Sequence, residues 1–236
     1  MIPKIIHYCW FGRGEMPELA LKCIVSWHKY MPDWEYKLWN EDNFDVNSVP
    51  YVKEAYEARK FAFVSDYVRL FALYNEGGLY LDTDVEVLKP FDELMTYSAF
   101  VGFEGSKHLP IGTCVMASAP QSLWVKEQLE SYEGIHFIQS NGSYDMKTNV
   151  VRITDNLTKN GLVCNGLEQD CGELHIFPVD YFSPRLTTGE YLRTEHTYSD
   201  HLAVGSWANK QKPFWMKIAG PEMSIRLIKL KRHLFG

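Results

Sequence analysis

The sequence has few cysteines, and none of them form the close pairs that zinc fingers and redox motifs use. An odd number, five, occurs in 236 residues, without any Cys-x-x-Cys spacing: Cys9, Cys23, Cys114, Cys164 and Cys171. This pattern argues against a disulfide framework and against a zinc site. It favours free thiols in a reducing compartment.

Long apolar runs are also missing. No stretch of 18 apolar residues occurs, and the N-terminal residues MIPKIIHYCWFG are too short and too polar for the apolar part of a signal peptide. We therefore expect neither a membrane span nor a secretory leader. Low-complexity segments and repeats are lacking too, and a chain of 236 residues with 46% hydrophobic side chains can build one domain with a sizeable core.

Positive charge is scarce except near the C-terminus. The formal net charge is −6, which argues against nucleic acid as the main partner. Residues 210–236 differ, because seven Lys or Arg and one Glu give them a net charge of +6. The sequence thus predicts a domain at 1–209 and a basic amphipathic tail at 210–236. Such a tail can lie on an anionic bilayer, or it can pack its apolar side on the domain.

Residues 77–84, GGLYLDTD, are the most informative segment. Two glycines end a helical pattern, a short apolar strand follows, and two carboxylates come at its end. Since side chains alternate along a strand, Asp82 and Asp84 are predicted to project to one side at its C-terminal edge, where open α/β sheets bind ligands. A divalent cation such as Mg²⁺ or Mn²⁺ would relieve their repulsion. A solvated polar turn is the alternative for the motif taken alone.

Helical and strand patterns alternate along the first half of the chain. This order predicts an α/β fold with a mixed sheet. We expect strands at 2–10, 34–40, 77–84 with an extension over 85–91, 99–105, 112–119 and 201–207, and a strand within 173–184 that leads to a Pro-bounded loop. Helices are expected at 17–30, 50–75 with a break near Lys60, 121–132 and 150–161.

Four segments occur in the order found in one enzyme family. They are IIHYCWFG, SDYVRLFALYNEGGLYLDTD, IFPVDYFSP and HLAVGSW. With them the chain resembles the Asp-x-Asp glycosyltransferases of family 32, which include yeast-type mannosyltransferases, bacterial surface-polysaccharide enzymes and, more distantly, large clostridial toxins. The resemblance implies a single GT-A domain, a Rossmann-like mixed sheet with flanking helices and a nucleotide-sugar site at the strand ends.

The resemblance also implies roles for five residues. Trp10 would stack on the nucleobase, since an indole offers a flat apolar face. Asp66 would accept hydrogen bonds from the donor sugar, and Arg69 would donate to sugar or phosphate oxygens. Asp82 would contact the ribose and reach the metal through water, while Asp84 would bind the metal directly. The alternatives are a core position for Trp10 and an ordinary intrahelical ion pair for Asp66 and Arg69.

By the same resemblance, the segment HLAVGSW (201–207) supplies further candidate ligands and contacts. His201 is the first candidate for another metal ligand, with Ser206 second, and Trp207 would close over the diphosphate or the base. Tyr80 is expected among the nucleotide-sugar contacts. An imidazole ligand would favour Mn²⁺ over Mg²⁺. His7, in the middle of a strand, is interpreted as structural. The sequence does not choose a catalytic base among the acids of the cleft: Glu104, Asp145, Asp155 and Asp180.

The expected activity is therefore the metal-dependent transfer of a hexose, with retained configuration, from a nucleotide sugar to a glycan or lipid-linked saccharide. A UDP-sugar is favoured, with GDP-mannose second. Without an apparent anchor, we expect a bacterial cytoplasmic enzyme of capsular or lipopolysaccharide synthesis, held at the inner leaflet by its tail. The alternatives are a metal-dependent nucleotide-sugar hydrolase or phosphodiesterase and a non-catalytic nucleotide-sugar-binding module.

Overall fold

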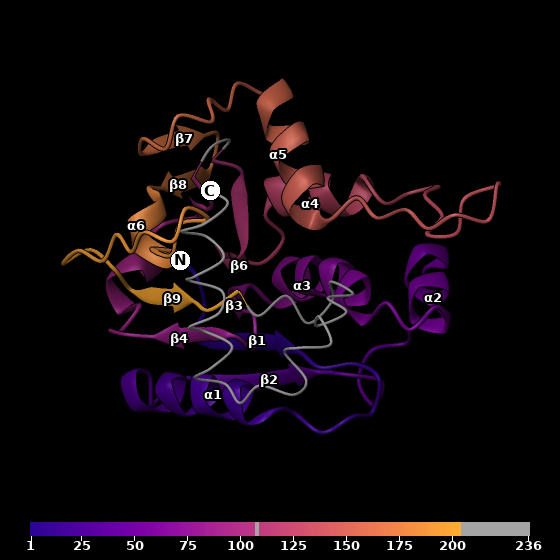
Figure 1. Ribbon diagram of the computed structural model, residues 1–236, viewed down its shortest axis with the longest axis horizontal. Helices are drawn as coiled ribbons and strands as arrows, with labels where there is room; N and C mark the ends of the chain where they lie inside the picture. The colour runs from indigo at the N-terminus through magenta and orange to yellow at the C-terminus, as the bar shows by residue number, and fades with distance from the viewer. Residues whose placement is uncertain (107–108, 204–236) are drawn as a thin grey trace, which may run out of the picture. The chain divides into compact units, whose positions relative to one another are not determined.

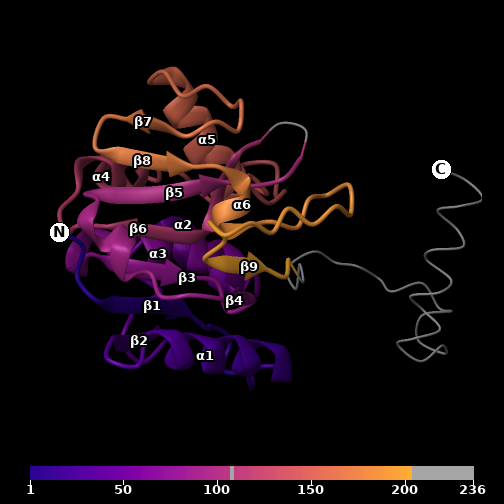
Figure 2. The ribbon, with the colours of Figure 1, turned by 90° about the vertical axis from the view of Figure 1, so that its left-hand side faces the viewer.

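A computed structural model describes residues 1–106 and 109–203 of the chain. The central sheet has seven strands in the order β2-β1-β3-β6-β5-β8-β7, which can be followed from bottom to top in Figure 2. The strands are β1 (Ile5–Cys9), β2 (Glu35–Trp39), β3 (Gly78–Leu81), β5 (Ala99–Phe103), β6 (Ile111–Ser118), β7 (Gln169–Cys171) and β8 (Leu174–Phe177).

The mixed character of the sheet follows from its pairings. Strand β1 pairs in parallel with β2 and β3, and β5 pairs in parallel with β8, whereas β6 runs antiparallel between β3 and β5. Five strands thus share one direction, and their C-terminal ends meet at one edge of the sheet. This confirms the predicted α/β class with a mixed sheet.

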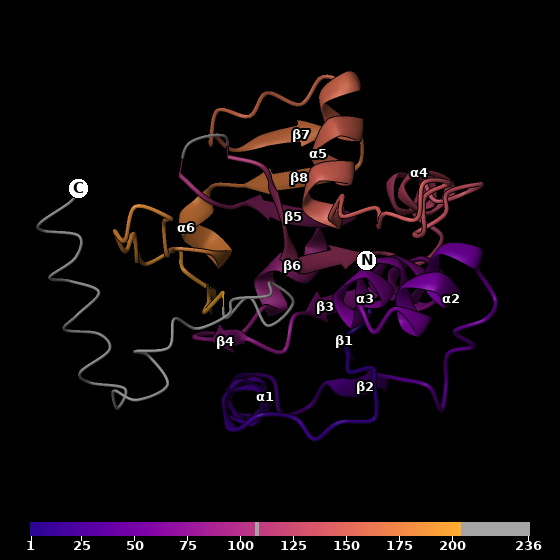
Figure 3. The same ribbon diagram turned by 45° about the vertical axis from the view of Figure 1, so that its right-hand side comes forward.

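Helices lie on both faces of the sheet, as Figure 1 and Figure 3 show. On one face are α2 (Pro50–Glu57), α3 (Phe61–Glu76), α4 (Leu123–Glu130) and α5 (Asn149–Lys159); on the other are α1 (Glu18–Tyr30) and the short α6 (Val179–Phe182). A 3₁₀ helix, η1 (Asp92–Thr96), precedes β5. Within the described residues, no helix is long and apolar enough to cross a membrane.

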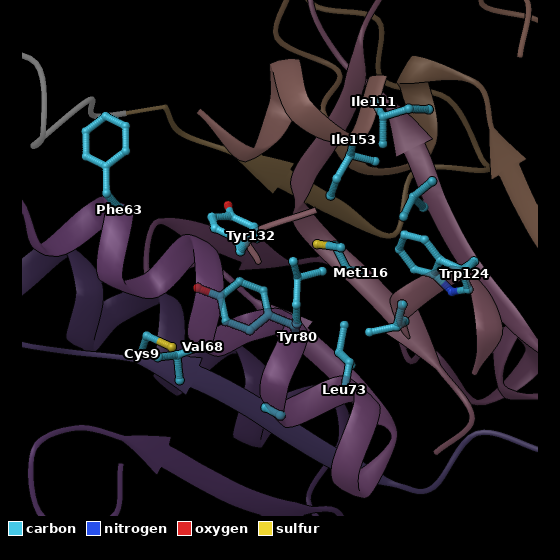
Figure 4. Close-up of a cluster of buried hydrophobic side chains, with 14 of the residues drawn as sticks. Cys9, Phe63, Val68, Leu73, Tyr80, Ile111, Met116, Trp124, Tyr132 and Ile153 are labelled. Atoms are coloured by element: carbon cyan, nitrogen blue, oxygen red, sulfur yellow. The ribbon is translucent and has the colours of Figure 1, made fainter. Parts of the chain in front are cut away.

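Successive side chains of the strands pack alternately into two separate hydrophobic clusters, one on each face of the sheet. In β3, Tyr80 belongs to the cluster under α2 to α5, while Leu79 and Leu81 face the cluster under α1 and α6. Figure 4 shows the first cluster, in which Tyr80 lies between α3 and the residues Met116 and Tyr132. A strand buried on both faces needs apolar residues at successive positions, which explains the continuous apolar run before Asp82.

The turn between α3 and β3 requires its two glycines. Gly77 has a φ of 66° and Gly78 a φ of 107°, and a Cβ atom at Gly78 would lie 2.6 Å from the carbonyl oxygen of Ile5. A side chain at either position would be strained. The helix therefore ends where the sequence predicted, and β3 enters the sheet directly beside β1.

The predicted extension of β3 was wrong. Residues 85–91 do not extend β3, because the chain turns after it, with the amide of Val85 donating to the carbonyl of Asp82 at 3.0 Å. A separate two-stranded sheet follows instead, formed by β4 (Val85–Val87) and β9 (Ser199–His201) in antiparallel pairing. Strand β9 begins two residues before the strand predicted at 201–207 and ends at His201, since Leu202 and Ala203 lie outside it. The rest of the predicted strand lies outside the described residues.

Candidate active site

The site lies where parallel strands end. Trp10 follows β1, Asp82 follows β3 and Glu104 follows β5, all at the C-terminal edge of the sheet. The amide of Asp82 still donates to the carbonyl of Cys114 on β6 at 2.9 Å. This bond fixes the backbone at the start of the Asp-x-Asp segment, so that the first carboxylate is held by the sheet itself.

The second small sheet brings a histidine to the two aspartates. Val85 pairs with His201, and the amide of Leu202 donates to the carbonyl of Asp84 at 3.0 Å. The His201 Nε2 atom lies 3.4 Å from a carboxylate oxygen of Asp84. One donor atom each of Asp82, Asp84 and His201 lie within 4.8 Å of one another, and all three side chains are partly exposed.

Helix α1 supports the sheet β4–β9 through hydrogen bonds to the backbone of β4. The indole nitrogen of Trp27 donates to the carbonyl of Val85 at 2.7 Å, and the ring is fully buried. The Ser26 hydroxyl accepts from the amide of Val87 at 2.9 Å. A rigid support of this kind keeps Asp84 and His201 at a fixed separation, as a cation site requires.

The pKa directions show a site rich in negative charge. Burial alone would lower the pKa of His201, but the neighbouring Cys114 sulfur and Asp84 carboxylate raise it well above the ordinary value. Burial raises the pKa of Glu104, and His201 opposes that shift. A positive charge is thus favoured at this position, and a proton on His201 supplies it in the absence of another cation.

The donor set suits a divalent metal ion. Carboxylate oxygens from Asp82 and Asp84 and an imidazole nitrogen from His201 are the ligand types that Mn²⁺ accepts, while magnesium prefers oxygen alone. The three residues converge from two different sheets. Packing of the hydrophobic core does not explain why polar side chains meet at this point. The residues present therefore fit the cation that the sequence predicted. Ser206, the other predicted ligand, lies outside the described residues.

Arg69 sits beneath the aspartates as a buried guanidinium. Its two terminal nitrogens lie 3.1 Å from Asp66 and 3.3 Å from Asp82, and it donates to the carbonyl of Thr113 at 2.6 Å. Burial opposes its charge, but Asp82, Tyr80 and Asp66 raise its pKa well above the ordinary value. Arg69 is thus a permanent cation that joins α3 to the Asp-x-Asp segment.

Tyr80 occupies a supporting position. Its side chain is 1% exposed, its ring lies 4.6 Å from the Arg69 guanidinium, and its hydroxyl donates to Asp82 at 2.9 Å. The expected contact between Tyr80 and the nucleotide sugar is not supported by this burial. The hydroxyl instead orients the Asp82 carboxylate from behind.

Asp66 has a second partner, which the sequence did not reveal. Its carboxylate accepts from the amide of Asn149 at 3.0 Å, and its carbonyl accepts from the Asn149 side chain at 2.9 Å. Asn149 is the first residue of α5, so Asp66 satisfies a free amide at that helix terminus. Burial raises the pKa of Asp66, whereas Arg69 and this amide lower it. No local signal in the sequence links residues so far apart.

Trp10 lies at the C-terminal edge of the sheet, directly after β1. Its side chain is partly exposed, and its indole nitrogen donates to the carbonyl of Gly14 at 2.6 Å. The loop at 11–14 thereby fixes one edge of the ring. Its predicted partner Trp207 lies outside the described residues, and stacking on a nucleobase stays a prediction.

Of the four acids proposed for the cleft, only Glu104 lies beside the cluster. Its Oε2 atom is 3.9 Å from His201 Nδ1. The other three have partners elsewhere: Asp145 pairs with Arg152, Asp155 with Lys147 and Asp180 with the hydroxyl of Thr194.

Comparison with known sequences identifies the same segment. Residues 17–101 match the family described as the glycosyltransferase sugar-binding region containing the DXD motif. Inositol phosphoceramide mannosyltransferase 3 of Schizosaccharomyces pombe is 37% identical over 107 residues, which cover 42% of this chain and 29% of that protein. Glucan organizing enzyme 1 of Cryptococcus neoformans is 40% identical over 83 residues, covering 32% and 23%. The alignments thus span less than a third of these relatives.

Comparison with solved structures concerns the fold. The PaToxG glycosyltransferase is 18% identical in sequence, with a TM-score of 0.51 over 67% of this chain and 69% of that one. The sheet and its flanking helices are of the GT-A type, as predicted. Asp66, Arg69, Asp82 and Asp84 all lie inside residues 17–101, the segment that matches the glycosyltransferase sugar-binding region containing the DXD motif.

Proposed function

We propose that this protein transfers a hexose from a nucleotide sugar to an acceptor and needs a divalent cation to do so. One observation carries the proposal: Asp82, Asp84 and His201 converge within 4.8 Å at the C-terminal edge of the sheet. These residues would hold the cation, with Mn²⁺ favoured over Mg²⁺ because of the imidazole. The match of residues 17–101 to the glycosyltransferase sugar-binding region supports the use of the site for glycosyl transfer.

The buried charges around the site suit a leaving group that becomes more negative. When bound, the cation would stabilise the charge that develops on the diphosphate as the sugar–phosphate bond breaks. Arg69 is already paired with Asp66 and Asp82, so its task is to hold those carboxylates in place. We propose retention of the anomeric configuration, as the family resemblance implies, with the departing phosphate accepting the acceptor's proton.

The donor and acceptor are proposed from chemistry and from the relatives' names. UDP-hexoses were the first expectation from the sequence, and the name of the mannosyltransferase relative adds weight to GDP-mannose. That name also couples mannosyl transfer to a lipid, inositol phosphoceramide, which supports a lipid-linked acceptor for this chain. We further propose that the enzyme works at the cytoplasmic face of a membrane, with the basic tail at 210–236 attached to its surface.

A donor panel tests the proposed function. The purified full chain would be incubated with Mn²⁺ and, in turn, with UDP-galactose, UDP-glucose and GDP-mannose, and free UDP or GDP would be measured. Each donor would be assayed alone and with candidate saccharide and glycolipid acceptors.

The pattern of nucleotide release separates the alternatives. A transferase releases nucleotide slowly from one donor, and an acceptor accelerates that release while a new glycoside forms. Fast release that no acceptor accelerates would contradict transfer and indicate a hydrolase. Binding of a donor without any release, across the panel, would contradict catalysis and indicate a binding module.

A further inference from the structure

A second group of donor atoms surrounds the same histidine. Single donor atoms of Glu104, Cys114 and His201 lie within 4.8 Å of one another, and each residue comes from a different strand or strand end. His201 presents Nε2 to Asp84 at 3.4 Å and Nδ1 to Glu104 at 3.9 Å. The imidazole therefore stands between two clusters, one on each side of the ring.

The local backbone makes room for Glu104. The pairing of β5 with β6 shifts register between Val101 and Gly102, just before the strand ends. A Cβ atom at Gly112, on the neighbouring strand, would lie 3.2 Å from Glu104 Oε2. Any larger residue at 112 would press on the carboxylate, so this glycine keeps the space that the acid occupies.

The chemistry of this second group differs from that of the aspartates. A thiolate sulfur, an imidazole nitrogen and a carboxylate oxygen are the ligands typical of zinc. Ligands at the usual zinc distances of about 2.0–2.3 Å in a tetrahedron are about 3.3–3.8 Å apart. Since the donor atoms lie within 4.8 Å of one another, they need to approach by no more than about 1.0–1.5 Å. Cys114 is 2% exposed, and its sulfur contacts the Ser183 hydroxyl at 3.4 Å, so it is fixed in position.

We propose that Glu104, Cys114 and Nδ1 of His201 form a site for a thiophilic divalent cation such as Zn²⁺, and that this site excludes the cation of the Asp82–Asp84 site. A neutral imidazole has one lone pair, on one nitrogen, so it serves one of the two cations at a time. Binding also releases two protons to solvent, one from the Cys114 thiol and one from the protonated His201 imidazole. Zinc is then an inhibitor; the exclusion and the inhibition rest on the proposed function, whereas the zinc site itself does not.

A zinc site at Cys114 differs from the expectation drawn from the cysteine spacing. The cysteine spacing argued against zinc, because sequence motifs for zinc sites place ligands in close pairs. Here the three ligands are brought together only by the β5–β6 pairing and by β9. One cysteine with two other ligand types leaves no motif in the sequence.

Cobalt is a direct probe of the thiolate ligand. The metal-free full chain, kept reduced with a phosphine, would be titrated with Co²⁺ and followed in the near-ultraviolet, where thiolate-to-cobalt charge transfer absorbs. We expect the band in the wild type. In Cys114→Ser it should vanish, and Co²⁺ affinity should fall at least about tenfold, the smaller loss seen even for outer-sphere changes. Glu104→Gln should weaken binding but keep the band.

Matched controls identify the sulfur. Cys164→Ser removes a partly exposed thiol outside the cluster and should leave the band unchanged. Circular dichroism would verify that Cys114→Ser folds, and Cys114→Ala offers a second variant. A wild type without the band, or a band of equal strength in Cys114→Ser, overturns the zinc site.

Competition between Zn²⁺ and Mn²⁺ tests whether one cation excludes the other, and it needs no activity measurement. Free Mn²⁺ would be followed by electron paramagnetic resonance while Zn²⁺ is added to the manganese-loaded protein. We expect zinc to release manganese from the wild type, and to do so at least about tenfold less effectively from Cys114→Ser. Zinc that binds without releasing manganese overturns the exclusion. These readouts are independent of turnover, so they stand even if the donor panel contradicts the proposed transfer.

Discussion

The Nε2 atom of His201 lies 3.4 Å from a carboxylate oxygen of Asp84, although the two residues come from segments far apart in the chain. The contact exists because β9 pairs with β4 immediately after the Asp-x-Asp turn. A histidine on a neighbouring strand thereby completes a cluster that the two aspartates begin. The geometry also explains the raised pKa of His201, since the nearby Cys114 sulfur and carboxylates favour a positive charge.

The first prediction concerns the buried charge of Arg69. Arg69→Met would leave Asp66 buried without its guanidinium partner, and removing one member of a buried ion pair typically costs about 3–5 kcal/mol. We expect a loss of that size in the free energy of unfolding, measured by urea denaturation. Donor turnover should fall as well, because Asp82 loses the same partner.

An exposed ion pair provides the matched control. Lys22 lies 2.7 Å from Glu18 on the surface of α1, and Lys22→Met should change stability little, because solvent screens such a pair. Equal losses of stability in Arg69→Met and Lys22→Met would contradict a special role for the buried network.

The second prediction concerns His7 and pH. The ring lies 2.7 Å from the carbonyl oxygen of Gly77 through Nε2, and its Nδ1 accepts from the Trp39 indole at 3.0 Å, so the neutral ring satisfies both nitrogens. Burial lowers the pKa of His7 below 6.5. A proton on Nδ1 would oppose the indole N–H and leave that buried donor unsatisfied, at a cost of about 1–3 kcal/mol.

The sign follows from the lowered pKa. The unfolded chain binds the His7 proton at a higher pH than the folded chain does, so stability is full above the unfolded pKa and falls as the pH drops below it. Melting temperatures between about pH 7 and pH 5 should therefore fall more in the wild type than in His7→Gln, which does not titrate there. Parallel curves for the two proteins would show that His7 contributes nothing to the pH dependence.

The third prediction separates nucleotide binding from chemistry at Trp10. The indole is partly exposed at the strand edge, so Trp10→Ala should fold and should lose about 1–3 kcal/mol of nucleotide affinity through lost stacking. Calorimetric titration with UDP and GDP measures the effect, and Trp10→Phe should retain most of the affinity. Unchanged affinity for both nucleotides in Trp10→Ala would remove Trp10 from the site.

The fourth prediction concerns the tail, which lies outside the described residues. Each Lys or Arg near an anionic bilayer contributes about 1 kcal/mol of attraction. Replacing Arg226, Lys229, Lys231 and Arg232 by Gln should therefore abolish sedimentation of the protein with anionic liposomes at low salt. Turnover on a soluble acceptor should persist. A wild-type protein that stays in the supernatant with such liposomes would end the membrane proposal.

Local patterns in the sequence were sufficient for most of the fold. The paired glycines at 77 and 78, the short apolar run before Asp82 and the Pro50 start of α2 all act within a few residues, so they could be interpreted without tertiary information. The extension of β3 over 85–91 failed because the turn at Asp82 redirects the chain, and the partner of β4 lies more than a hundred residues later. Tertiary pairing decided that element.

The same distinction applies to the site. Asp82 and Asp84 could be predicted to follow the end of a buried strand, although they lie in the turn after β3 and not on alternating positions of that strand. His201 was found only through family resemblance. Neither strand patterns nor the family resemblance predicted the hydrogen bond from Asn149 to Asp66 or the position of Cys114 beside His201. These contacts join distant segments through single side chains, which leave no periodic pattern or spacing in the sequence.

We propose that glycosyl transfer depends on a cation that Asp82, Asp84 and His201 would hold. The most direct measurement is nucleotide release from the preferred donor, in the presence of acceptor, by wild type, Asp84→Asn and Glu86→Gln, before and after chelation and return of Mn²⁺. Glu86 is an exposed acid two residues from Asp84, and its variant should behave like the wild type. We predict that chelation silences the wild type, that Mn²⁺ restores it, and that Asp84→Asn loses about 10²–10³ in kcat. Wild-type turnover that survives chelation, or an Asp84→Asn variant as active as Glu86→Gln, would contradict a role for the cation in transfer.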